Sequence, residues 1–235
     1  MAWGIATTGL AAQPDLTDPN QKINYALGLD MVSTFQKQEF DLDMSSFLAG
    51  MADSLAGKPA LTPDQKAAAL KEMQAYVQAK SMVRLKELAA TNLQAGTAFL
   101  AANAQKEGVQ VKTVTAPDGS PAELQYKILQ SGPPGASPQS NDIVEVHYEG
   151  HLIDGTLFDS SVKRGTPATF GLNNVMPGWR AALSMMRAGD KWQLCLPPKL
   201  AFGEFGGTRV GPNCTIVCEL ELLSFYTPKP VPAKP

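Results

Sequence analysis

The sequence is informative first through what it lacks. It has no block of basic residues, and its 20 Lys and Arg are balanced by 22 Asp and Glu. This balance argues against nucleic acid as a partner, because phosphate binding needs clustered cations. No apolar run is long enough to cross a bilayer, so we expect no membrane span. The composition therefore favours an ordinary globular enzyme or binding protein.

Cysteine is scarce and uneven. The three cysteines are Cys195, Cys214 and Cys218, and an odd number cannot form a closed disulfide framework. Cys214 and Cys218 lie four residues apart in an expected strand, roughly 13 Å, which is too far for one disulfide. We expect buried free thiols.

Histidine is scarcer still, and the chain lacks a complete metal motif. His147 and Glu149 match half of a zinc deaminase signature, but the other half needs Pro-Cys-x-x-Cys, and Cys218 lies one residue too far from Cys214. The glycine-rich run 203–211 lacks the Gly-Lys-Ser/Thr ending of a phosphate loop. We therefore expect no metal and no cofactor, and we find no nucleophile with an assembled base.

What is present divides into two halves. The first hundred residues predict helices at 20–39 and 44–57, the second capped by Asp43. Thr62-Pro63-Asp64-Gln65 is a capping box with proline at the first helical position. From there a helix can continue to about Gln105, because no proline appears before Pro117.

Beyond Gly108 the pattern becomes that of strands. We expect strands at 109–114, 124–129, 143–153, 192–196 and 215–225, and a return strand with Phe158 after a hairpin turn at Asp154-Gly155. We also expect a short helix at 179–187 and a glycine-rich loop at 197–213. In the strand at 143–153, Val144, Val146 and Tyr148 share one face and the two histidines lie on the other.

Several large apolar residues fall at inward strand positions or at element ends in this second half. They are Tyr148, Phe158, Phe170, Val175, Met176, Trp179 and Phe202. Any one of them alone is better interpreted as an ordinary core residue. Their order and the motifs between them favour a shared apolar pocket.

Those motifs resemble a known family. Residues 144–161 (VEVHYEGHLIDGTLFDSS), 164–170 (RGTPATF), 175–179 (VMPGW), 201–203 (AFG) and 211–215 (GPNCT) are similar, in register, to FKBP-type peptidyl-prolyl cis-trans isomerases. The Pro-Gly-Trp form and the preceding helices resemble the Mip and FkpA branch of bacterial members. The resemblance covers about residues 20–225 and is most specific over 144–225.

The resemblance implies an α+β fold, in which an all-α dimerisation module and a long connecting helix precede a five- or six-stranded antiparallel sheet wrapped around a short helix. It implies isomerisation of X-Pro bonds in unfolded or flexible polypeptides, with chaperone activity from the dimer. It assigns catalysis to Tyr148, Phe158, Asp159, Val175, Met176, Trp179 and Phe202, with Trp179 as the pocket floor. It assigns substrate binding to Arg164, Ala168, Phe170, Val210 and Cys218. It also places Asp159 and Arg164 at the pocket rim, where the two can pair.

Two departures keep an alternative open. Phe202 stands where the family usually has Tyr, and Cys218 stands where it usually has a pocket Phe. The alternative function is an FKBP-fold chaperone or peptide-binding scaffold with little isomerase turnover.

We expect four segments: an N-terminal arm or signal remnant (1–19), a helical dimerisation domain with its linker helix (20–107), the isomerase domain (108–226) and a proline-rich disordered tail (227–235). The apolar side chains of residues 20–56 exceed what two short helices can bury alone, which predicts a homodimer through this segment. The small, mildly apolar N-terminus favours a periplasmic or secreted location, with a cytoplasmic one as the alternative.

Overall fold

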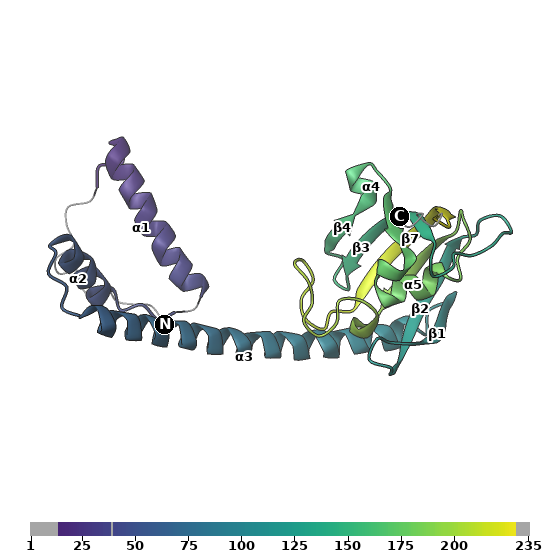
Figure 1. Cartoon of the computed structure of the whole chain (residues 1–235), viewed down its shortest axis with the longest axis horizontal. Coiled ribbons are helices and arrows are strands. Elements are labelled where there is room, and N and C mark those ends of the chain that lie inside the picture. Colours follow the sequence, from purple (N-terminus) through teal and green to yellow (C-terminus); the bar gives the residue numbers. More distant parts are fainter. Residues whose placement is uncertain (1–13, 39, 229–235) are drawn as a thin grey trace, which may run out of the picture. The chain divides into compact units, whose positions relative to one another are not determined.

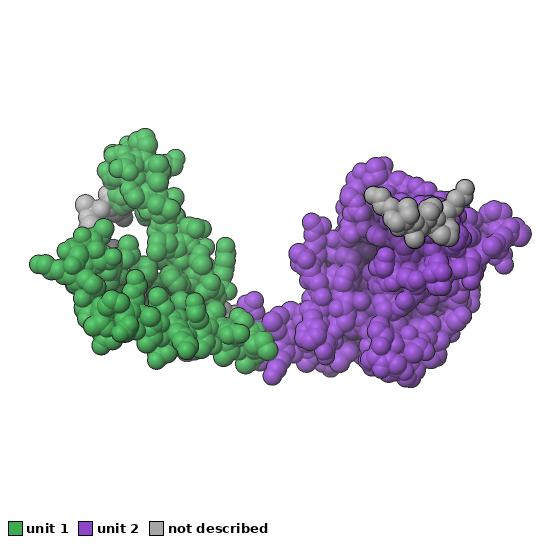
Figure 2. Space-filling model, viewed as in Figure 1, with its two compact units in different colours: residues 1–83 green, residues 84–235 purple. Residues whose placement is uncertain are grey.

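The computed structural model describes residues 14–38 and 40–228. Most of the expected N-terminal arm and of the proline-rich tail therefore lies outside the described residues. The chain forms two compact units, residues 1–83 and 84–235 (Figure 2). The division between them falls inside one long helix. The domain boundary expected at residues 107 and 108 stays a prediction.

Capping side chains fix where the helices begin. Helix α1 (Pro19–Lys37) is capped by Asp18, and α2 (Met44–Leu55) by Asp43, whose carboxylate accepts from Ser46 N at 2.7 Å. Helix α3 (Pro63–Asn103) begins at the expected capping box, in which Gln65 N donates to Thr62 Oγ1 at 3.2 Å and Thr62 N donates to Gln65 Oε1 at 2.9 Å. The three predicted helices are confirmed within two residues at each end.

Aromatic rings hold the first unit together. Phe35 of α1 packs against Phe40 and against Phe47 of α2, with ring centroids 5.9 Å apart in both pairs. Phe40 also meets Tyr76 of α3 edge to face, at 6.2 Å. Helices α1 and α2 nevertheless have no buried residue. The apolar stripe of α2, formed by Met44, Leu48, Met51 and Leu55 at helical spacing, is exposed along its whole length.

The second unit contains one antiparallel sheet. Its strands are β1 (Val109–Thr115), β2 (Pro121–Gln130), β3 (Ile143–Leu152), β4 (Leu157–Ser160), β5 (Ala168–Gly171), β6 (Lys191–Leu196) and β7 (Ile216–Tyr226). The order is β1-β2-β6-β7-β3-β4, and β5 pairs with β3. The described residues thus form seven strands rather than the five or six expected. The extra strand is β5, which is only four residues long and is held by pairing with Ile143–Val146.

Short helices connect the strands. They are α4 (Ser161–Arg164) and α5 (Pro177–Leu183), together with the 3₁₀ turns Leu172–Asn174 and Pro198–Leu200. Helix α5 lies against the sheet (Figure 1), and it buries Trp179, Ala182 and Leu183. It ends at Leu183 rather than at residue 187 as predicted, and the backbone then passes through turns to Gly189.

The alternation predicted for β3 is confirmed. Val144, Val146, Tyr148 and Gly150 are buried, and the residues between them are only half-buried. Strand β3 pairs along its length with β7, where Gly150 lies opposite Cys218. This register brings the inward face of β3 and the middle of β7 to the same side of the sheet, where the pocket lies.

The cysteines among the described residues are free, as expected. Cys195 and Cys218 are buried, whereas Cys214 is half-buried. Leu194 lies opposite Cys218 and Cys195 lies opposite Val217, so the thiols of Cys195 and Cys218 project from opposite faces of the sheet.

Candidate active site

A pocket of about 260 Å³ opens between the sheet and α5. Most of its lining is apolar, and the lining comes from six separate elements and the loops between them. The residues that line it are Tyr148, Gly150, Phe158, Asp159, Phe170, Asn174, Val175, Met176, Trp179, Phe202 and Cys218. A concave apolar site with a few polar groups at one edge is the form expected of a binding site for a small apolar group.

The aromatic rings in this lining pack against one another edge to face. Tyr148 meets Trp179 edge to face with ring centroids 4.9 Å apart, and Phe158 meets Phe202 in the same way at 5.8 Å. Trp179 is 4% exposed. Edge-to-face pairs of this kind are each worth about 0.5–1.5 kcal/mol beyond their burial, so the lining is stiff.

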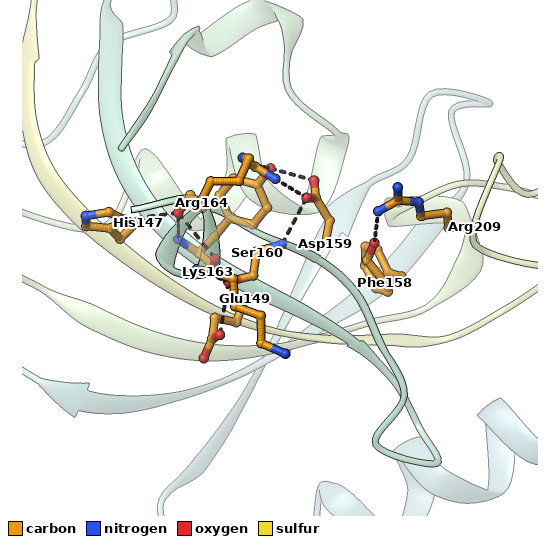
Figure 3. A network of polar contacts seen from close by, with 10 residues as sticks. His147, Glu149, Phe158, Asp159, Ser160, Lys163, Arg164 and Arg209 are labelled. Carbon is orange, nitrogen blue, oxygen red and sulfur yellow. Dashed lines mark hydrogen bonds and ion pairs between the residues drawn. The ribbon is translucent and has the colours of Figure 1, made fainter. Parts of the chain in front are cut away.

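One polar network occupies the rim of the pocket (Figure 3). The hydroxyl of Tyr148 donates to Asp159 Oδ2 at 2.6 Å, and Arg164 Nη2 donates to the Tyr148 hydroxyl at 2.8 Å. Arg164 also forms an ion pair with Asp159. The pairing of Asp159 with Arg164 expected from the sequence is confirmed.

The network fixes the protonation of its members. Partial burial alone would raise the pKa of Asp159, but hydrogen bonds from Tyr148 and Arg164, together with the charge of Arg164, lower it below its ordinary value. Burial, with the hydrogen bond to Asp159, raises the pKa of Tyr148. At neutral pH the rim therefore carries a carboxylate, a neutral phenol and a guanidinium.

Ser161 anchors the network to the sheet. This fully buried side chain accepts from Tyr148 N at 2.8 Å, and its hydroxyl lies 3.1 Å from His147 Nδ1. It follows Ser160, whose side chain caps α4 by accepting from Lys163 N at 3.0 Å. Two consecutive serines thus turn β4 into α4, and Arg164 reaches the rim from the end of that helix.

The structure brings most of the predicted site residues together. All seven expected to act in catalysis line the pocket, as do Phe170 and Cys218 from the substrate-binding set. Arg164 lies at the rim. Ala168 and Val210 do not line the pocket: Ala168 lies on β5 opposite Val146, and Val210 is buried in the loop before β7. The roles of all these residues remain predictions.

Two lining residues were not predicted. Gly150 contributes space rather than a side chain, since a Cβ there would lie 2.5 Å from the Phe158 ring. Its inward position in β3 was a usable signal. Asn174 ends the 3₁₀ turn after β5, and no sequence pattern marks it.

The residues of the pocket offer no metal site. Among the described residues, no three His, Cys, Asp or Glu side chains gather as a potential metal site. Burial raises the pKa of Cys218 to about 12, so its thiol is neutral. The pocket therefore offers an apolar enclosure with a fixed polar rim, and this suits a reaction without a covalent intermediate.

Comparison with known proteins agrees with this geometry. The family model described as FKBP-type peptidyl-prolyl cis-trans isomerase matches residues 135–223, and the model described as the domain amino-terminal to it matches residues 20–128. The chain therefore belongs to the FKBP-type peptidyl-prolyl cis-trans isomerases, and it is an enzyme of that class.

Within that family the chain is similar to Mip and FkpA proteins. It is 38% identical over 226 residues to the outer membrane protein MIP of Legionella longbeachae, covering 94% of this chain and 93% of the relative. It is 39% identical to peptidyl-prolyl cis-trans isomerase Mip of Coxiella burnetii, covering 94% and 92%. The crystal structure of FkpA from Escherichia coli matches with a TM-score of 0.71 at 33% identity, over 89% of this chain and 98% of that one.

In the part of the chain that the structure describes, no helix combines the length and apolar character needed to span a bilayer.

Proposed function

We propose that the pocket isomerises prolyl bonds by removing water from the X-Pro amide. The amide resists rotation by about 18–20 kcal/mol because resonance gives its C–N bond double-bond character. Resonance also places negative charge on the oxygen, where water stabilises it, and this charge shrinks in the twisted state. An apolar pocket therefore disfavours the planar amide more than the twisted one.

The observation that carries this proposal is the composition of the lining. The proline ring would lie against Trp179, between Phe158 and Phe202, where few polar groups compete for the amide. The Tyr148 hydroxyl is already engaged by Asp159 and Arg164. The backbone N–H of Met176, at the edge of the pocket, would hold the substrate carbonyl. A thousandfold acceleration needs only about 4 kcal/mol of such differential binding.

The proposed substrates are unfolded or flexible polypeptides, and the proposed working form is a homodimer through residues 20–56 with chaperone activity. The exposed stripe of α2 supports the dimer, because Met44, Leu48, Met51 and Leu55 share one helix face and are exposed. A two-fold axis would bring two copies of this stripe together. Burial of each large side chain is worth about 1.5–3 kcal/mol.

A periplasmic or secreted location is proposed with it. The relative from Legionella longbeachae is named an outer membrane protein, and this supports a place in the cell envelope. A cytoplasmic location is the alternative.

The catalytic proposal is tested with short Xaa-Pro peptides. We expect acceleration that is strongest with an apolar Xaa, and at least a several-fold loss in Phe158→Ala and in Asp159→Ala. A chain that binds prolyl peptides without accelerating their isomerisation would instead support the scaffold function, which the replacement residues Phe202 and Cys218 favour.

The dimer is tested by sedimentation and by refolding of a proline-limited protein. Leu48→Glu with Met51→Glu should yield a monomer that keeps its activity on peptides and loses much of it on the refolding protein. Ser46→Glu adds a single negative charge on the opposite face of α2 and should leave the dimer intact. A wild-type monomer at micromolar concentration would contradict the proposal.

A further inference from the structure

The loop between β6 and β7 places one wall of the pocket. It contributes Phe202 to the lining, and it holds little regular structure beyond the 3₁₀ turn Pro198–Leu200. Four glycines interrupt it, at Gly203, Gly206, Gly207 and Gly211. Glycine adds conformational freedom, so fixing such a loop needs contacts from outside it.

The two ends of this loop are tied to each other next to Phe202. Asn213 N donates to Gly203 O at 3.1 Å, directly after the pocket residue. Asn213 has φ of 52°, and it is the one non-glycine residue with positive φ in the described parts of the chain. Asn adopts this left-handed conformation more readily than most residues. The position of Phe202 therefore depends on where Pro212 and Asn213 are held.

Helix α3 holds them. Asn92 Nδ2 donates to Pro212 O at 2.8 Å, across 120 residues of sequence. A Cβ at Gly211 would lie 3.2 Å from the same nitrogen, so the amide of Asn92 packs directly on the loop backbone. Asn213 Nδ2 reaches back to Ala89 O at a longer 3.5 Å. These residues belong to the compact unit 84–235.

The opposite side of the loop is held more weakly. Arg209 Nη1 donates to Phe158 O at 3.3 Å (Figure 3), and the Arg209 side chain is on an exposed residue. Between residues 203 and 213 the loop has hydrogen bonds to Asn92, Ala89 and Phe158 outside it. The one from Asn92, at 2.8 Å, is the shortest of these three.

We propose that Asn92, on the helix rather than in the pocket, is a positioning residue for the isomerase site. It fixes Pro212, and through the hydrogen bond between Asn213 and Gly203 it fixes Phe202. The inference rests on Phe202 contacting substrate, as proposed above. Without the Asn92 donor the loop samples more conformations, and substrate must order it on binding.

Steady-state kinetics on the full chain test this. Asn92→Asp keeps the shape of the side chain and removes its N–H donor. A hydrogen bond of ordinary strength corresponds to roughly a three- to tenfold change. We expect KM for a short prolyl peptide to rise by roughly that factor, with kcat within about twofold of wild type, and amide exchange at Gly207 and Asn213 to quicken.

Two matched variants make the result decisive. Among the described residues the Thr91 hydroxyl bonds only to Glu87 O of the same helix, so Thr91→Ala should leave KM unchanged. Phe202→Ala tests the wall itself. If Phe202→Ala impairs the enzyme while Asn92→Asp leaves KM and exchange unchanged, the role of Asn92 is refuted and the pocket proposal stands. If Phe202→Ala has no effect, the proposed wall of the pocket is wrong.

Discussion

At the scale of single residues, Asp159 is the group whose ionisation the rim controls. Its pKa is lowered from 3.8, so the carboxylate is favoured by folding. The stabilisation that follows is complete above pH 3.8 and is lost as the pH falls through the lowered pKa of the folded state. Isomerase activity that depends on the network should fall over the same acid range.

Removing Arg164 should shift the acid limb of the pH–activity profile. Arg164→Ala deletes a hydrogen bond and a charge that lower the pKa of Asp159, so the acid limb of the pH profile of kcat/KM should move to higher pH. The measurement is a protease-free isomerase assay below pH 6, with urea denaturation at each pH to show that the variant is folded. An unchanged limb would mean that Arg164 does not set the ionisation of Asp159.

Gly150 is the second residue for which the structure predicts a specific effect of substitution. A methyl group there would lie 2.5 Å from Cζ of Phe158 and would push that ring out of its place opposite Phe202. We expect Gly150→Ala to lower kcat/KM at least several-fold and to cost about 1–3 kcal/mol of unfolding free energy through overpacking. Denaturant unfolding and peptide kinetics separate the two effects.

Gly135→Ala is the matched control, because the nearest atom to a Cβ there is Pro133 O at 3.9 Å. That variant should keep both activity and stability. Full activity in Gly150→Ala would show that the Phe158 ring can move without loss of catalysis.

At the scale of elements, the sequence predicted what local chemistry decides. The starts of α2 and α3 could be predicted because Asp43 and Thr62 have side chains that cap a helix and Gln65 completes a capping box. The alternation of β3 was legible because one of its faces is buried. Helix α4 and strand β5 were missed because each has only four residues, too few to give a sequence pattern. Both lie against β3 in the fold, and β5 is held by pairing with it.

The same division applies to the site. Inward-facing aromatics and the family motifs located nine of its lining residues. Gly150 and Asn174 were missed because Gly150 acts through the absence of a side chain and Asn174 lies in a short 3₁₀ turn that no sequence pattern marks. The contacts of α3 with the loop before β7 join residues more than a hundred positions apart, and no local pattern reports such a pair.

Helix α3 carries the prediction at this scale. A Cβ at Gly96 would lie 2.3 Å from Thr215 Oγ1 and 3.0 Å from Thr215 Cβ. In an exposed helix Gly→Ala gains about 1 kcal/mol, but overpacking here costs about 1–3 kcal/mol. We expect Gly96→Ala to lower the unfolding free energy of the unit that contains it.

The partner side chain gives the control. Thr215 Oγ1 is buried, and it has no hydrogen-bond partner among the described residues. Thr215→Ala should therefore be nearly neutral alone and should restore much of the loss in the Gly96→Ala background. Additive losses in the double variant, measured by denaturant unfolding, would contradict direct contact as the cause.

At the scale of the whole molecule, we expect the segment 84–103 of α3 to set the stability of an isolated isomerase fragment. Gln125 is 2% exposed; its Oε1 accepts from Asn103 Nδ2 at 3.0 Å, and its Nε2 donates to Leu100 O at 2.9 Å. A fragment beginning at Arg84 keeps these bonds. We expect it to be monomeric, cooperatively folded and active on short peptides.

A fragment beginning near Gln105, where the sequence predicts that the long helix ends, loses those partners. It should remain monomeric and active on peptides, but it should melt at a lower temperature than the fragment from Arg84. Calorimetry of the two fragments makes the comparison. Equal melting temperatures would show that the helix segment adds nothing to the stability of the isomerase unit.

The engaged hydroxyl of Tyr148 has a consequence for hydration. With that hydroxyl bonded to Asp159 and Arg164, and with Phe202 contributing only a ring, the depth of the pocket offers solvent few partners. Water in a poorly hydrated apolar pocket is weakly held, and its release favours binding through enthalpy rather than entropy. Titration calorimetry of a prolyl ligand should therefore show a favourable enthalpy at 25 °C with a negative heat-capacity change. Phe202→Tyr, which supplies a hydroxyl for solvent to bind, should make the enthalpy less favourable for the same ligand unless that ligand takes the new hydrogen bond itself.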